Sequence, residues 1–83
     1  MASQYTCNVI AAGPSATPDV VCIRLKDIGG AFDDRWFDAY EPKAKEMLAT
    51  ALAAMASGFR VWVELEAAEE YGRINYLYAT KSA

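Results

Sequence analysis

The sequence contains no histidine and only two cysteines in 83 residues. Without histidine, the chain lacks the side chain that most often serves enzymes as a general base and metals as a ligand. Two cysteines that are not spaced as C-x-x-C do not form a zinc site by themselves. We therefore expect no metal, no cofactor and no enzymatic activity.

Positive charge is also scarce, because 8 Lys and Arg stand against 11 Asp and Glu and the net charge is −3 at pH 7. Nucleic-acid binding draws its affinity from clustered basic residues, whereas those of this chain are scattered. No hydrophobic run approaches the roughly 20 residues that a membrane span needs. The composition predicts a soluble protein without a membrane span and argues against a nucleic-acid partner.

The first five residues lack the basic start and apolar run of a secretory signal. This leaves the compartment open. The length predicts one domain over residues 1–83, and 54% hydrophobic residues are enough to give it a core. Domains of this size are often helped by oligomerisation, a disulfide or a metal.

A helix is predicted over residues 42–57. Pro42 suits a first helical turn and Gly58 suits the left-handed residue that ends a helix. A stripe at three- and four-residue steps is expected to face the core, and it comprises Ala44, Met47, Leu48, Ala51, Leu52 and Met55. The opposite side carries the small residues Ala49, Ala53 and Ala56. These form an expected oligomer contact, with the alternative that alanine is simply the best helix former.

Five segments show the alternation or the β-branched and aromatic content of strands, at residues 5–11, 20–26, 35–40, 59–66 and 73–80. Turn signals separate the first two at Gly13, Pro14, Pro18 and Asp19. In the last segment the alternation predicts one face with Ile74, Tyr76 and Tyr78 and the other with Asn75, Leu77 and Ala79. The acidic loop before it, residues 67–72, reads as a solvated turn or a contact.

The two cysteines fall on different faces of their predicted strands. Cys7 shares a face with apolar residues, whereas Cys22 shares one with Arg24 and Lys26. Residues that pair directly across antiparallel strands lie on the same face, so regular pairing predicts two unpaired thiols. A bulge in the first strand would allow a Cys7–Cys22 bridge instead.

Three aromatic residues on otherwise polar faces are candidate ligand-binding residues, namely Trp36, Tyr40 and Trp62. An exposed tryptophan provides large apolar area for a partner subunit or a sugar ring. The alternative is that the indole of Trp62 covers a neighbouring aliphatic stem, such as that of Arg60. The acidic residues Asp33, Asp34 and Asp38 match no calcium-loop spacing and are expected to be solvated.

The predicted order is strand, strand, strand, helix, strand, strand. This is the order of a five-stranded OB-like Greek-key barrel, an α+β and mostly β fold whose helix lies between the third and fourth strands. The competing architecture is an open antiparallel sheet with the helix across it.

The helix and the strand after it, MLATALAAMASGFRVWVEL, resemble the corresponding segment of small bacterial OB-fold proteins similar to pentameric toxin B subunits. The matching positions are Leu48, Ala51, Leu52, Ala54, Gly58, Val61, Val63 and Leu65. The resemblance implies a secreted ring of subunits that binds sugars. No sugar-binding residue is carried over from it.

These observations predict a non-enzymatic homo-oligomeric OB-like module that binds a glycan or a protein. The alternative is a structural or adaptor protein, such as a phage or microbial accessory subunit. A single-stranded nucleic-acid binder is a third hypothesis, supported by OB topology and aromatic residues but opposed by the acidic charge.

Overall fold

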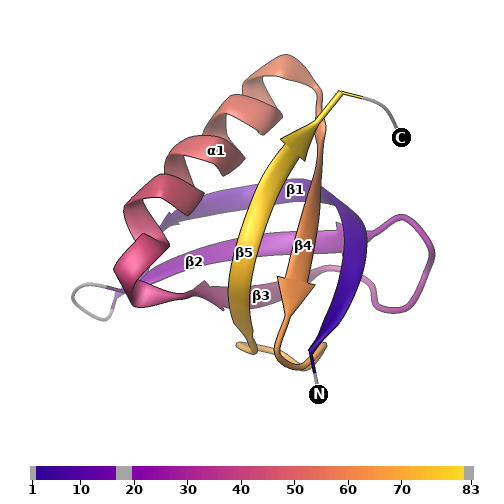
Figure 1. Cartoon of the computed structure of the whole chain (residues 1–83), viewed down its shortest axis with the longest axis horizontal. Helices are drawn as coiled ribbons and strands as arrows, with labels where there is room; N and C mark the ends of the chain where they lie inside the picture. The colour runs from indigo at the N-terminus through magenta and orange to yellow at the C-terminus, as the bar shows by residue number, and fades with distance from the viewer. Residues whose placement is uncertain (1, 17–19, 82–83) are drawn as a thin grey trace.

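The chain folds into a closed barrel of five strands with one helix (Figure 1). This computed structural model describes residues 2–16 and 20–81, so the turn signals Pro18 and Asp19 lie outside the described residues. The elements are β1 (Ser3–Pro14), β2 (Val21–Asp27), β3 (Arg35–Ala39), the 3-10 turn η1 (Glu41–Lys43), α1 (Ala44–Ser57), β4 (Arg60–Leu65) and β5 (Arg73–Thr80). The predicted order of elements and the OB-like barrel are confirmed.

The strands follow one another around the barrel in the order β1, β2, β3, β5, β4. The first half of β1 pairs with β4 and the second half with β2, and Ile10 is an extra residue where this second register shifts. Because one long strand serves both halves of the sheet, β1 closes the barrel. β3 and β5 pair in parallel over two residues, and the other pairings are antiparallel.

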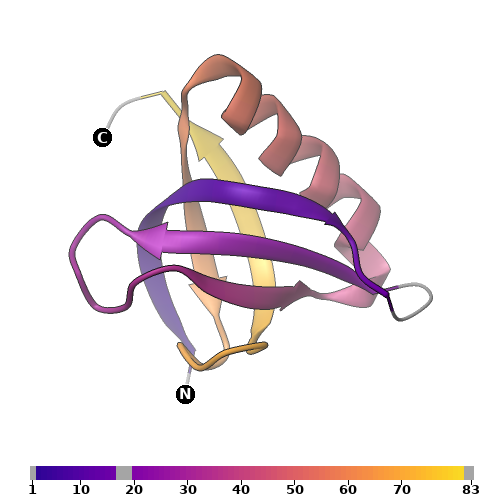
Figure 2. The same cartoon turned by 180° about the vertical axis from the view of Figure 1, so that it is seen from behind.

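The interior of the barrel is filled by alternate residues of the strands. The alternation within residues 20–26, 35–40 and 59–66 predicts that apolar residues share one face of each strand, and the structure confirms this, because the fully buried members of the core include Ile23, Leu25, Phe37, Val61, Val63 and Leu65. The strands β1, β2 and β3 lie side by side on one broad surface of the molecule (Figure 2).

The helix covers one open end of the barrel and packs mainly against β5 and β1 (Figure 1). Its end at Gly58, which has φ 72°, is confirmed. The predicted core stripe is wrong in part, because Leu52 and Met55 are exposed and Leu48 is only half-buried, while the buried side comprises Ala44, Met47, Ala51 and Ala54. Three of these four residues are alanines, so small side chains let the helix backbone lie close to the barrel.

The faces predicted for β5 are also wrong in part. Ile74 and Leu77 are both buried, although strict alternation places them on opposite faces. The register with β4 shifts here, because Glu64 pairs with Tyr76 whereas Leu65 pairs with Ile74. The extra residue, Asn75, is a β-bulge that reverses the side on which the following residues point.

Candidate functional site

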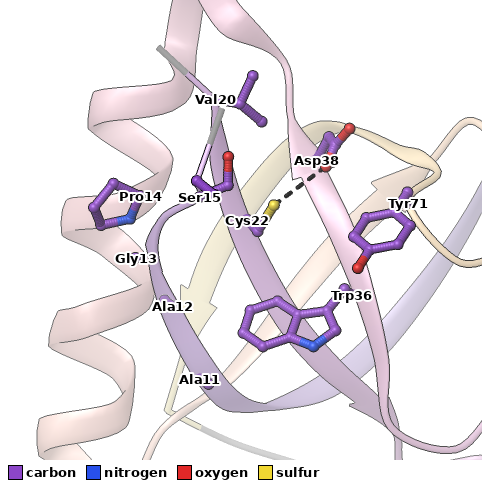
Figure 3. A pocket seen from close by; sticks show the side chains of 11 residues that line it. Ala11, Ala12, Gly13, Pro14, Ser15, Val20, Cys22, Trp36, Asp38 and Tyr71 are labelled. Carbon is purple, nitrogen blue, oxygen red and sulfur yellow. Dashed lines mark hydrogen bonds between the residues drawn. The ribbon is translucent and has the colours of Figure 1, made fainter. Parts of the chain in front are cut away.

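A groove of about 750 Å³ crosses the outer surface of β1, β2 and β3. Residues of the β1–β2 loop form one wall, and the β4–β5 loop contributes Tyr71 to the other. Figure 3 shows the side chains of Trp36, Asp38 and Tyr71 around Cys22. The groove therefore lies where OB-type barrels place their ligand surface, on strands two and three between these two loops.

The floor of the groove follows from the strand register. Gly13 pairs with Cys22, and Cys22 pairs in turn with Asp38 on β3. Because paired residues share a face, all three point outward at the same level of the barrel. Nothing lies within 4 Å of the position that a Cβ of Gly13 would occupy, so the small residue keeps this part of the groove open.

Cys22 and Asp38 form a polar pair on this floor. The Cys22 Sγ donates a hydrogen bond to Asp38 Oδ1 over 3.3 Å (Figure 3). Burial raises the pKa of the Cys22 thiol, and the hydrogen bond to the Asp38 carboxylate raises it further. The thiol is therefore protonated at neutral pH, and the carboxylate has a second oxygen with which to accept hydrogen bonds.

The β4–β5 loop is fastened along the edge of β3. The Tyr71 N–H donates to the Trp36 carbonyl over 2.6 Å, and the Trp36 N–H donates to Glu70 Oε2 over 2.8 Å. Tyr71 has φ 64°, a left-handed conformation that is uncommon outside glycine. At Gly72 a Cβ would lie 2.2 Å from the Ala67 carbonyl oxygen, so this position must be glycine. These bonds fix the backbone at Tyr71, whose side chain is 59% exposed and lines the groove.

Basic residues of β2 continue the same outer surface beyond the groove. Arg24 lies opposite Trp36, with its guanidinium carbon 5.9 Å from the centre of the indole. The predicted solvated acids near it form open ion pairs, Arg24 with Asp34 at 3.5 Å and Lys26 with Asp33 at 4.0 Å. Exposed pairs of this kind contribute little to stability.

The three predicted ligand-binding residues do not share one site. Trp36 lines the groove, whereas Tyr40 follows β3, where its ring lies 5.1 Å from the guanidinium carbon of Arg73. Trp62 points outward from β4, which β5 separates from β3. Of the three predicted ligand-binding residues, only Trp36 therefore belongs to the candidate site.

Trp62 belongs to an aromatic cluster on the outside of β4 and β5. Its ring lies nearly parallel to that of Tyr78, at 14° and 5.9 Å, and 5.7 Å from that of Tyr76. Gln4 Nε2 donates to the Tyr76 hydroxyl over 2.8 Å. The neighbours of Trp62 are thus two tyrosines, which the bulge in β5 brings onto its face, and 36% of the tryptophan remains exposed.

A polar network extends from this cluster toward the β4–β5 loop. Asn75 Nδ2 donates to Glu64 Oε2 over 3.0 Å and to Glu66 Oε1 over 3.1 Å, and Arg73 Nε donates to Asn75 Oδ1 over 2.8 Å. The hydrogen bond from Asn75 is the main cause of a lowered pKa of the Glu66 carboxyl, and Arg73 adds to it. Every member has a partner, so we interpret this network as structural support for the bulge.

The alanine face of the helix lies at the surface. Ala49, Ala53 and Ala56 are exposed, and Leu52 and Met55 are exposed beside them. This face is therefore more apolar than the sequence pattern predicts, because two large residues assigned to the core lie on it.

Three groove residues, Cys22, Asp38 and Tyr71, were not predicted as ligand-binding residues. The alternation places Cys22, Trp36 and Asp38 on outer faces, but only the pairing of β2 with β3 brings them together. Among the described residues, no group of three or more Cys, Asp or Glu has the arrangement of a metal site. The chemistry of the groove is that of hydrogen bonding and ring stacking.

Within residues 2–16 and 20–81, no helix has the length and apolar character needed to cross a membrane. Comparison of the chain with protein-family models, with curated proteins and with solved structures gives no match, so its function has to be argued from the groove itself.

Proposed function

We propose that this protein is a non-enzymatic OB-like binding module whose groove takes a sugar ring. The observation that carries the proposal is the position of the Trp36 indole beside the Asp38 carboxylate on the groove floor, with Tyr71 at the wall. Sugar sites combine an aromatic surface for the C–H face of a pyranose with acceptors for its hydroxyl groups. Hydrogen bonds hold the main chain at both aromatic residues, so little backbone ordering is needed on binding.

Charge favours a sugar over a nucleic acid as the occupant of the groove. A strand of nucleic acid would bring its phosphates past the carboxylates of Asp38 and Glu70, in a chain of net charge −3. Phosphates and carboxylates repel each other, which opposes binding of a nucleic acid. The hydroxyl groups of a sugar instead donate hydrogen bonds to the same carboxylates. OB-type surfaces accept both classes of ligand, so the charges decide between them.

The test is a glycan array probed with the wild-type protein, Trp36→Ala and Trp62→Ala. We expect the wild type to bind, Trp36→Ala to lose about tenfold or more in affinity because it removes the stacking surface, and Trp62→Ala to bind normally. Thermal unfolding of each variant checks that the fold is intact. Binding that is lost in Trp62→Ala and kept in Trp36→Ala would move the site to the aromatic cluster. Binding to no glycan would overturn the proposal.

The second candidate function is an adaptor that binds protein. It is favoured by the exposed cluster of Trp62, Tyr76 and Tyr78, since aromatic residues of this kind are enriched at protein interfaces. A protein partner would cover this cluster and leave the groove free, so the two variants above separate the two functions.

The proposal includes assembly into a homo-oligomer through the alanine face of α1. An exposed helix side formed by Ala49, Leu52, Ala53, Met55 and Ala56 supports it, because small residues allow close approach and the larger ones provide apolar area. A secreted ring of toxin B subunit type remains the prediction of the sequence resemblance alone.

A further inference from the structure

Arg24 lies at the end of the proposed sugar site. Among the residues assigned to sugar binding, its neighbour is Trp36. The two are directly paired, and the next outward pair along the same strands is Cys22 with Asp38. Outward residues on one strand are roughly 7 Å apart, because each residue advances the strand by about 3.4 Å. Arg24 and Asp38 thus occupy successive outward levels of adjacent strands, with a spacing of roughly 7 Å along the strands that is comparable to the length of a pyranose ring.

The hydrogen-bonding capacity of Arg24 is poorly used. Its Nε is buried and has no hydrogen-bond partner among the described residues. Its ion pair with Asp34 is long, at 3.5 Å, and both side chains are well exposed, at 39% and 38%. The buried Nε is out of reach of a ligand, but the two terminal Nη groups of the exposed guanidinium can donate bidentately to a carboxylate or sulfate.

We infer that the ligand of the groove is a sugar ring that bears one anionic group, and that Arg24 binds this group. The inference rests on the proposed function and specifies its ligand class. The ring stacks on Trp36, its hydroxyl groups donate to Asp38, and a carboxylate or sulfate on the ring accepts from the Arg24 guanidinium in place of Asp34. Charge-assisted and bidentate hydrogen bonds of this kind are the stronger ones in proteins.

The charges of the groove limit the ligand to a single anionic group at this end. Toward its other end the groove presents the Asp38 carboxylate, and Glu70 lies at the Trp36 backbone. A second anionic group on the far side of the ring would face these carboxylates. A ligand that is anionic at one end and rich in hydroxyl groups at the other therefore fits this surface, whereas a polyanion does not.

The first experiment measures affinity for three matched probes by titration of amide NMR signals. The probes are methyl β-D-glucopyranoside, methyl β-D-glucuronide, which has a carboxylate at C6, and methyl β-D-glucopyranoside 6-sulfate. We expect at least one anionic probe to bind about tenfold more tightly than the neutral one, and the comparison shows whether carboxylate or sulfate is preferred. In Arg24→Gln this advantage disappears, whereas Arg60→Gln on β4, which removes an equal charge elsewhere, keeps it.

A second variant tests the displacement of Asp34. In Asp34→Asn the guanidinium loses its competitor, so affinity for the preferred anionic probe rises about threefold or more while affinity for the neutral probe is unchanged. The control is Asp33→Asn, which removes the same charge from the partner of Lys26 and leaves the affinity unchanged. A merely structural role of Arg24 predicts no gain in Asp34→Asn, and that result would overturn the inference.

The remaining outcomes separate this inference from the proposed function. Equal binding of neutral and anionic probes, abolished in Trp36→Ala, would overturn the anionic subsite and leave the sugar site in place. Absence of binding by any probe and by any array glycan would overturn both. Tight, salt-dependent binding of a thymidine oligonucleotide that Arg24→Gln weakens would overturn both in favour of a nucleic-acid surface.

Discussion

The two cysteines, Cys7 and Cys22, lie on opposite sides of the barrel wall and therefore have different environments. Both thiols are free. Cys7 is fully buried in the core and pairs with Asp27, whereas Cys22 points outward to the groove and pairs with Gly13. The bulge at Ile10, which the sequence left open as a route to a disulfide, does not bring the two together, because Cys7 pairs with Asp27 at one end of β2 and Cys22 lies near the other end, opposite Gly13.

The buried Cys7 thiol makes stability depend on alkaline pH. Burial, with a smaller contribution from Asp27, raises the pKa of Cys7 from 9.0 to about 12. Below pH 9 the thiol is protonated in both the folded and the unfolded chain. As the pH rises from 9 toward 12, the unfolded chain releases its proton first, so the free energy of unfolding falls by about 1.4 kcal/mol per pH unit.

Urea unfolding of the wild type and Cys7→Ala at about pH 8 and about pH 10.5 measures this effect. The two proteins differ only at the thiol, so the difference between their free energies of unfolding isolates its contribution. We expect the advantage of the wild type to shrink at the higher pH. A difference that stays constant would contradict the raised pKa.

The helix shows how packing at the level of an element departs from a sequence pattern. Its spacing is compatible with two neighbouring stripes, one through Leu48, Leu52 and Met55 and one through Met47, Ala51 and Ala54. The predicted core face combined residues of both stripes. The barrel buries the second stripe, in which Met47 is accompanied by alanines that let the helix approach β5 and β1 closely.

Two methionines on this helix provide a matched test. Met47 is 3% exposed and Met55 is 38% exposed. We expect Met47→Ala to lower the free energy of unfolding by about 2–3 kcal/mol, because it leaves a cavity between helix and barrel. We expect Met55→Ala to change it by less than about 1 kcal/mol. Chemical denaturation of both variants measures the difference, and equal losses would contradict the observed packing.

The last strand, β5, also departs from its sequence pattern. A strict period of two places Ile74 on the face of Tyr76 and Tyr78, but the bulge at Asn75 sends Ile74 inward and both tyrosines outward. The bulge thus lets Ile74 fill the core while both tyrosines lie in the aromatic cluster around Trp62. A bulge has no reliable signature in one sequence, since it depends on how the partner strand pairs.

At the scale of the whole molecule, closure of the barrel distributes the aromatic residues over separate surfaces. Trp36 and Trp62 point outward from strands that are not neighbours, so one lines the groove and the other lies on the far side of β5. The protein therefore presents a groove, an aromatic cluster and an apolar helix face, each accessible without the others.

Light scattering at several concentrations tests the proposed oligomer. We expect a mass that is a multiple of the 9.1 kDa chain, and we expect Ala53→Glu to reduce it to that of a single chain while the helical circular dichroism signal is retained. A charge at the centre of an apolar contact is costly to desolvate, which is the reason for the expected dissociation. If the wild type has the mass of a single chain at every concentration, the proposed interface is wrong and the alanines of this face reflect helix propensity alone.

The sequence by itself determined the order of the elements, the C-terminal end of the helix and the inward faces of β2, β3 and β4. These features depend on residues close together in the chain, namely Gly58 and the alternation of apolar with polar side chains, whereas Pro42 lies in the 3-10 turn before the helix, which begins at Ala44. Only the tertiary structure decided which outer faces meet. The groove requires the register of β1, β2 and β3 and the attachment of the β4–β5 loop to Trp36, and such pairings join residues far apart in sequence, which no local pattern encodes.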